Sequence, residues 1–109
     1  MKVLATKTFI KSAKAIAKKY RSFNSDFRNL VSELENNPAA GVDLGNGFRK
    51  VRMAITSKGK GKSGGCRVIT LDLVERNGCI YLMYIYDKSD YENIALSAIK
   101  EYASDMGLL

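Results

Sequence analysis

Histidine is absent from this sequence of 109 residues, and cysteine occurs only twice. Without histidine, the side chain that most often serves as acid or base near neutral pH is missing. The cysteines and carboxylates also form no cluster with metal-ligand spacing, so zinc sites and two-metal nuclease mechanisms are not expected. We therefore predict chemistry that uses no metal and no other cofactor.

The low cysteine count argues against a disulfide framework. Cys66 and Cys79 would lie far apart on a hairpin, roughly 30 Å at about 3.3 Å per residue, which rules out a bridge between them. We expect both to be buried thiols, as in a cytoplasmic protein.

Long apolar runs are lacking as well. With no run of about 18 apolar residues, a membrane-spanning helix is excluded. Residues 1–14 do not have the uninterrupted apolar centre of a secretory signal, because Lys7 and Lys11 interrupt it. We predict a cytoplasmic protein with no membrane partner.

Carboxylates are missing from residues 45–70, although seven cations lie there. These cations are Arg49, Lys50, Arg52, Lys58, Lys60, Lys62 and Arg67. The whole chain has a net charge of +7. Like charges at this density repel one another unless a polyanion neutralises them, and nucleic acid is the first candidate.

Hydrophobic periodicity predicts one α+β domain over residues 1–109. The expected elements are a strand at Lys2–Thr6, helices at Thr8–Tyr20 and 26–34, strands at Phe48–Ile55, Cys66–Val74 and Cys79–Asp87, and a helix beginning at the capping box Ser89–Glu92. They predict an antiparallel sheet of three to four strands, covered by an N-terminal helical hairpin and a C-terminal helix. The lysines of the first helix either form its solvated face or bind RNA or an acidic partner.

The loop over residues 56–65 contains GKGKSGG, which is similar in composition to a phosphate-binding P-loop. That motif needs a glycine five residues before Gly61, where this chain has Thr56, and it needs a helix afterwards. The residues that follow are β-branched and predict a strand. An NTPase is therefore rejected.

Asn77-Gly78 is a strong signal for a two-residue hairpin turn. Such a turn would oppose Leu73 with Leu82, Leu71 with Tyr84, Ile69 with Tyr86, and Arg67 with Lys88. Like charges that face each other destabilise a sheet, so the last pair indicates that a bound phosphate supplies negative charge. The alternative is that Asp87 or Asp90 screens the pair.

Alternation along the first hairpin strand places Lys50 and Arg52 on one face. For half of the possible registers this face also holds Arg67, Tyr84, Tyr86 and Lys88. Cations would then hold an RNA backbone and tyrosines would stack on bases, unless the tyrosines only pack within the sheet.

RNA can be cleaved without a metal, because its 2′-hydroxyl is an internal nucleophile. A lysine crowded by other cations can move protons, while arginine remains a permanent clamp. The candidate catalytic residues are Lys50, Arg52, Arg67 and Lys88.

Four stretches carry a family resemblance: residues 48–52 (FRKVR), 57–62 (SKGKGK), 64–69 (GGCRVI) and 85–89 (IYDKS). They resemble the HigB-like branch of the RelE/ParE toxin superfamily. The resemblance implies a RelE-like toxin of a type II toxin-antitoxin pair, which cleaves mRNA on the ribosome and is neutralised by a protein antitoxin. It also implies RNA or ribosome contacts at Lys58, Lys60 and Lys62, which belong to the signature of this branch. We further predict RNA contacts at Arg49, Tyr86 and Tyr91.

One departure from the family concerns a tyrosine that takes part in catalysis in the RelE member. The corresponding region here reads Ile94-Ala95-Leu96, with Tyr91 nearby but offset. Two other functions stay open: an RNA- or ribosome-binding protein that does not cut, and the gyrase-inhibiting activity of the superfamily's other branch.

Overall fold

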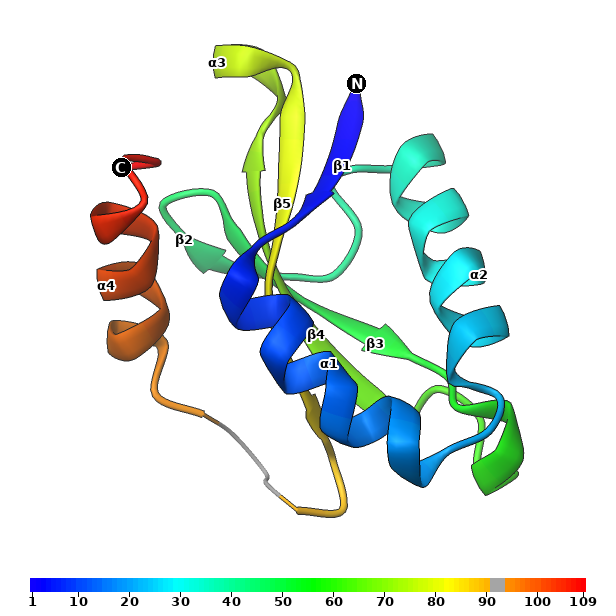
Figure 1. Ribbon diagram of the computed structural model, residues 1–109. Helices are drawn as coiled ribbons and strands as arrows, with labels where there is room; N and C mark the ends of the chain where they lie inside the picture. Colours follow the sequence, from blue (N-terminus) through cyan, green and yellow to red (C-terminus); the bar gives the residue numbers. More distant parts are fainter. Residues whose placement is uncertain (91–93) are drawn as a thin grey trace.

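A sheet of five strands lies between two helical layers in the computed structural model, which describes residues 1–90 and 94–109 (Figure 1). The elements are β1 (Lys2–Ala5), α1 (Lys7–Lys19), α2 (Phe23–Asn36), β2 (Val42–Gly45), β3 (Phe48–Met53), the 3₁₀ turn η1 (Thr56–Lys58), β4 (Cys66–Leu73), α3 (Val74–Asn77), β5 (Cys79–Asp87) and α4 (Leu96–Asp105). The strand order is β1-β5-β4-β3-β2, and only the β1–β5 pairing is parallel among these neighbours. The predicted α+β class is confirmed, with more strands than expected.

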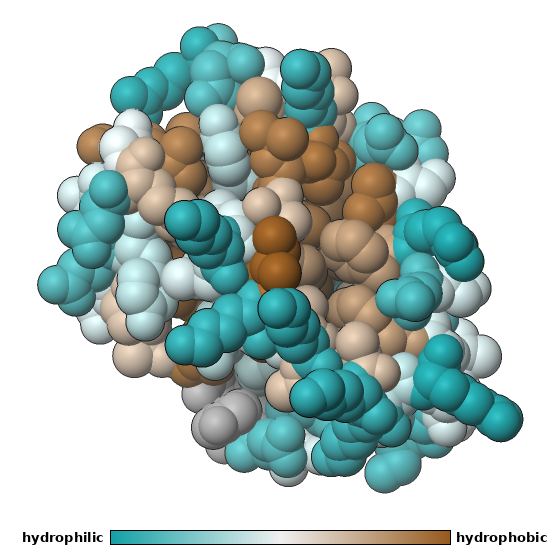
Figure 2. All heavy atoms as spheres, viewed as in Figure 1, coloured by the Kyte–Doolittle hydropathy of each residue, from teal (hydrophilic) through white to brown (hydrophobic). Residues whose placement is uncertain are grey.

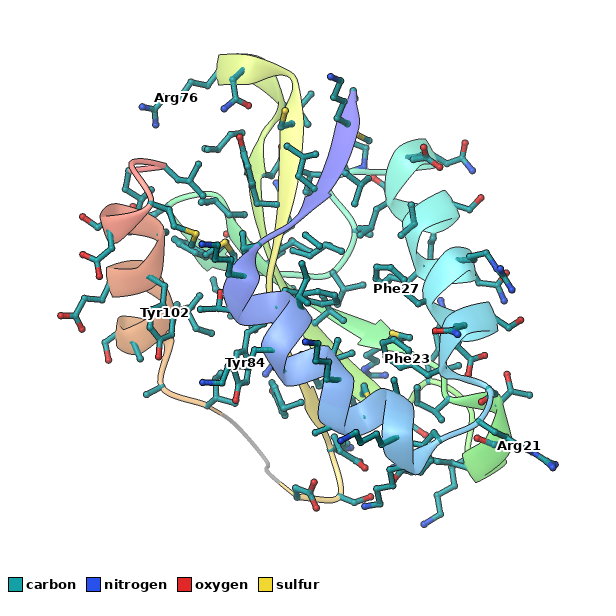
Figure 3. All side chains as sticks on the ribbon, in the orientation of Figure 1. Arg21, Phe23, Phe27, Arg76, Tyr84 and Tyr102 are labelled. Atoms are coloured by element: carbon teal, nitrogen blue, oxygen red, sulfur yellow. The ribbon has the colours of Figure 1, made fainter. Side chains whose placement is uncertain are left out.

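Helices α1 and α2 cover one face of the sheet. They bury apolar residues that recur at helical spacing, among them Phe9, Ile16, Leu30 and Leu34, against Val51 and neighbouring sheet residues. Phe23 and Phe27 stack between α2 and the sheet with ring centroids 5.8 Å apart (Figure 3). The outer side of α1 is basic, and hydrophilic side chains follow it across the front of the molecule (Figure 2). The predicted pair of N-terminal helices is thus confirmed.

Helix α4 covers the other face, where Ile99 and Ala103 are buried against Phe48, Leu71 and Met83. The helix begins at Leu96, not at the predicted capping box. The Ser89 N–H donates instead to the side chain of Asp87, so Ser89 and Asp90 form a turn. Tyr91 and Glu92 lie outside the described residues. Periodicity in this helix also places Tyr102 and Met106 on its apolar side, which is wrong, because both are exposed.

The β4–β5 hairpin differs from the predicted two-residue turn. Residues Val74–Asn77 form the helical turn α3, and Gly78 ends it in the left-handed region at φ 77°. Asn77-Gly78 therefore closes a longer connection, and a bulge at Met83 shifts the register once more. The observed pairs are Leu73 with Cys79, Leu71 with Tyr81, Ile69 with Tyr84, and Arg67 with Tyr86. The predicted opposition of Arg67 and Lys88 was wrong.

Strand β2 lies within the segment that the sequence predicted to be loop. Asn46 at φ 56° and Gly47 at φ 87° form the tight turn that joins it to β3. At the other edge β1 ends at Ala5, because Thr6 caps α1: its hydroxyl accepts from the Phe9 N–H and donates to the Leu82 carbonyl.

The two cysteines lie at opposite ends of the β4–β5 hairpin and are both free. Cys66 is buried as predicted, whereas Cys79 is half-buried. The helices within the described part of the chain are all too short or too polar to cross a membrane.

Candidate functional site

A row of three side chains crosses the middle strands of the sheet. Arg52 of β3 lies opposite Arg67 of β4, and Arg67 lies opposite Tyr86 of β5. Opposed residues share a face, and alternation along β3 adds Lys50, which is paired with Ile69. The chain thus has one of the registers that bring Lys50, Arg52, Arg67 and Tyr86 together, on the α4 side of the sheet.

The two arginines of the row have different surroundings. Arg67 is 6% exposed, and its guanidinium donates to the carbonyls of Lys62 at 3.0 Å and of Ser63 at 3.1 Å. These carbonyl dipoles compensate the charge of Arg67, and the two hydrogen bonds attach the loop over residues 56–65, the glycine-lysine loop, to β4. Arg52 is exposed. An anion on this face would therefore meet Arg52 directly, with Arg67 acting from beneath.

Lys50 and Tyr86 line a small pocket of about 70 Å³ between the sheet and residues 94–96. Tyr86 is only 3% exposed, and burial raises its pKa, while the charge of Arg67 acts in the opposite direction. Its ring packs in the core rather than presenting a stacking surface. Tyr84, half-buried on the same face, lies nearer to solvent (Figure 3).

Lys88 is the first residue after β5 and lies two residues beyond Tyr86 of the row. Its N–H donates to the Gly65 carbonyl at 3.2 Å, which continues the β4–β5 register past Asp87. Lys88 is exposed and borders a hollow of about 210 Å³, together with Lys60, Ser63, Gly64 and Ser89. Two cations predicted from sequence, Lys60 and Lys88, therefore come together at the rim.

Lys58 lies in a buried ion pair on the opposite side of the sheet, the side that α1 and α2 cover. Its ammonium lies 2.8 Å from a carboxylate oxygen of Asp87, and these side chains are 7% and 2% exposed. Burial alone would raise the pKa of Asp87, but hydrogen bonds from Lys58, Tyr20 and the Ser89 N–H lower it far below its usual range. Lys58 is thus committed to Asp87, and Asp87 does not screen the cations of the row.

The remaining predicted RNA contacts are dispersed. Lys62 forms an exposed ion pair with Glu33 at 2.7 Å. Arg49 lies on the face that α1 and α2 cover and forms an ion pair with Asp72 at 2.7 Å. Tyr91 lies outside the described residues. The structure therefore groups Lys50, Arg52, Arg67, Tyr86, Lys60 and Lys88, whereas the charged ends of Lys58, Lys62 and Arg49 are held in ion pairs with carboxylates.

Sequence reasoning missed two buried carboxylates that hold the loop region in place. The carboxylate of Asp87 accepts hydrogen bonds from the Tyr20 hydroxyl and the Lys58 ammonium. The carboxylate of Asp26 in α2 accepts hydrogen bonds from the N–H and hydroxyl of Thr56 and from the hydroxyl of Ser22. The sequence offers one signal for the burial of Asp87: because it follows Tyr86 in a strand, its side chain points to the opposite face, which α1 and α2 cover. The partners themselves come from distant segments and have no local signature.

The structure defines a small α+β domain with a basic row on one sheet face, a charge distribution that suits an anionic partner. Residues 1–107 match the family described as the RelE toxin of the RelE/RelB toxin-antitoxin system. The match covers almost the whole chain, and the protein belongs to the RelE toxin family. It is therefore a toxin of a toxin-antitoxin system, and a cognate antitoxin is its implied partner. The HigB-like character rests on the sequence stretches alone.

Proposed function

We propose that the protein is a metal-independent, ribosome-dependent endoribonuclease that cleaves mRNA and so inhibits translation. The observation that carries the proposal is the row on the α4 side of the sheet. It brings an exposed arginine, Arg52, beside Lys50 and above the buried charge of Arg67. Such a cationic surface suits the phosphate whose negative charge increases during cleavage.

The reaction needs alignment more than an external nucleophile. The 2′-oxygen attacks the adjacent phosphorus, the bond from phosphorus to the 5′-oxygen breaks, and a 2′,3′-cyclic phosphate and a 5′-hydroxyl result. The proton of the 2′-hydroxyl leaves to a base, and the departing 5′-oxygen gains one. Arg52 would stabilise the phosphoryl oxygens, and Lys50 and Lys88 are the amines of the set that could move these protons.

The two macromolecular partners follow from the same charge. The ribosome would present the mRNA as a single strand, in a conformation that the basic face alone does not impose. A cognate antitoxin would neutralise the toxin by placing carboxylates against this face.

The proposal is tested by expressing Lys50→Ala with Arg52→Ala in a host that lacks the antitoxin. We expect loss of growth arrest and a fall in mRNA cleavage of about 100-fold or more, the cost of removing transition-state charge stabilisation. The matched control is Arg21→Ala with Arg28→Ala, which removes the same charge from exposed positions; Arg21 points away from the protein (Figure 3). Full arrest by a folded Lys50/Arg52 variant would refute the proposed site.

A second measurement separates cutting from binding. Purified ribosomes are programmed with mRNA that carries one 2′-deoxynucleotide directly 5′ of the cleaved bond. Cleavage should stop at that bond, because the nucleophile is missing, and unmodified mRNA should show new 5′-hydroxyl ends. Arrest of translation without new ends would indicate a binder that does not cut, and a DNA-damage response would indicate gyrase inhibition.

A further inference from the structure

The hollow at the rim of the site has properties that the proposed nuclease activity does not by itself require. Lys60 and Ser63 of the loop meet Lys88 and Ser89 of the segment after β5. The stem of Lys60 lies against Gly64, where a Cβ would collide with it. Two exposed ammonium groups and two hydroxyls from different segments thus border one shallow, open hollow of about 210 Å³.

The hydroxyl of Ser89 is oriented by the buried ion pair beneath it. Lys58 donates from its ammonium to the Ser89 oxygen at 2.9 Å and to Asp87 at 2.8 Å. Because a hydroxyl has only one proton, and its oxygen already accepts from Lys58, that proton remains available to donate to another acceptor. Ser89 is exposed, so an anion in the hollow can accept it.

The nearby carboxylates do not cancel this positive surface. Asp87 is 3% exposed and points to the side that α1 and α2 cover. There its negative charge is compensated by Lys58 and Lys19 and by the hydroxyl of Tyr20. Asp90 lies close enough to Lys19 to contribute, after Tyr20, to raising the pKa of that amine. Among the described residues, the charged side chains that line the hollow are those of Lys60 and Lys88.

The position of the hollow relates it to the row. Lys88 follows Tyr86 by two residues in a continued strand register, which is roughly 7 Å along β5. Arg52 lies two strands away on β3, roughly 10 Å across the sheet, so phosphates of one strand can reach both sites only because the side chains of Arg52 and Lys88 are long. An RNA strand that crosses the row from β3 to β5 would then pass from Arg52 to the rim.

We propose that the hollow formed by Lys60, Ser63, Gly64, Lys88 and Ser89 binds the backbone phosphate next to the reacting one, with Lys58 and Asp87 as positioning residues. This inference rests on the proposed function and makes it more specific. Lys88 then binds substrate at a neighbouring linkage, while Lys50 and Arg52 contact the reacting phosphate. Lys58 acts through Ser89 and touches no substrate.

The test compares Lys60→Gln with Lys88→Gln against a control pair, Lys2→Gln with Lys7→Gln. The control removes the same charge from exposed positions, and Lys2 lies beside Cys79, at the end of β5 opposite to Lys88. Binding of a fluorescent single-stranded RNA is measured by anisotropy over a range of salt concentrations. Losing one phosphate contact should reduce the slope of log affinity against log salt by about 0.7. The control pair should keep the slope of the unmodified protein.

RNA with one neutral methylphosphonate linkage at a time locates the contact. One linkage should weaken binding by the unmodified protein and have no further effect on the Lys60/Lys88 pair. Lys58→Met should reduce the slope like that pair, whereas a merely structural role would leave the slope of the folded variant unchanged. A Lys60/Lys88 slope equal to the control would overturn the inference, and with a weakened antitoxin complex it would assign the hollow to antitoxin carboxylates.

The two proposals can fail separately. If the phosphate contact is found but no new RNA ends appear, the subsite stands and the nuclease proposal falls. If RNA is cut and the slope does not change, the subsite falls.

Discussion

Lys58 and Lys62 lie four residues apart in the same loop region, yet their surroundings differ completely. The Lys58–Asp87 pair has side chains that are 7% and 2% exposed, whereas those of the Lys62–Glu33 pair are 56% and 42% exposed. Removing one partner of a buried pair leaves an uncompensated charge in a medium that solvates it poorly. A surface pair is weakened by water and salt.

Two single substitutions should show this difference. Lys58→Met should lower the free energy of unfolding by about 3–5 kcal/mol. Lys62→Met should change it by roughly 0–1 kcal/mol. Urea unfolding of both variants measures the two costs under the same conditions, and equal small losses would contradict the structural role of Lys58.

The same pair shows where sequence reasoning at the residue scale reaches its end. Both lysines stand beside glycine or serine in a polar loop, and the resemblance gave both the same role. Which one is buried depends on Asp87, 29 residues further on, and on Tyr20. No local pattern records these contacts.

Elements are where the sequence was most informative. Periodicity identified α1, α2, β3, β4 and β5, because each has one apolar face. Alternation along β3 also placed Lys50 and Arg52 on one face. The cross-strand partner of Arg67 could not be derived, since it depends on the helical turn α3 and the bulge at Met83, and the Asn-Gly signal favours a shorter turn.

The junction of the loop with β4 provides a test at this scale. A Cβ added to Gly65 would lie 2.1 Å from the backbone carbonyl oxygen of Met53 in β3, whereas one added to Gly64 would lie 2.4 Å from the Cβ of Lys60 in the exposed loop. Gly65→Ala should therefore force β3 and β4 apart. The free energy of unfolding should fall by about 1–3 kcal/mol or more, the usual cost of overpacking.

Gly64→Ala serves as the comparison for that substitution, because its clash is relieved by a shift of the exposed loop that carries Lys60, whereas the clash at Gly65 is with a strand of the sheet. Thermal unfolding of the two variants gives the comparison. A Gly64 variant less stable than the Gly65 variant would contradict the close approach of Gly65 to β3.

At the scale of the whole molecule, two buried carboxylates connect the helical layer to the loop region. Asp26 of α2 binds Thr56, and Asp87 of β5 binds Lys58 and Tyr20. Burial alone would raise the pKa of Asp26, but the hydroxyls of Thr56 and Ser22 and the Thr56 N–H lower it. The pKa of Asp87 is lowered too.

These directions determine the acid response of the fold. A carboxylate whose pKa is lower in the folded state contributes stability that is fully present above its ordinary pKa of 3.8 and is lost as the pH falls through its folded-state pKa. The free energy of unfolding should therefore decrease between about pH 5 and pH 1. Asp26→Asn should be less stable at neutral pH and should show a flatter decrease in urea unfolding across this range. A parallel decrease would mean that Asp26 contributes nothing to it.

The parallel pairing of β1 with β5 has a consequence for synthesis. The first strand to leave the exit tunnel has its partner between Cys79 and Asp87, so the sheet cannot close while that segment is still being translated. A nascent copy therefore cannot complete this sheet, or the row that crosses it, until the residues up to Asp87 have emerged.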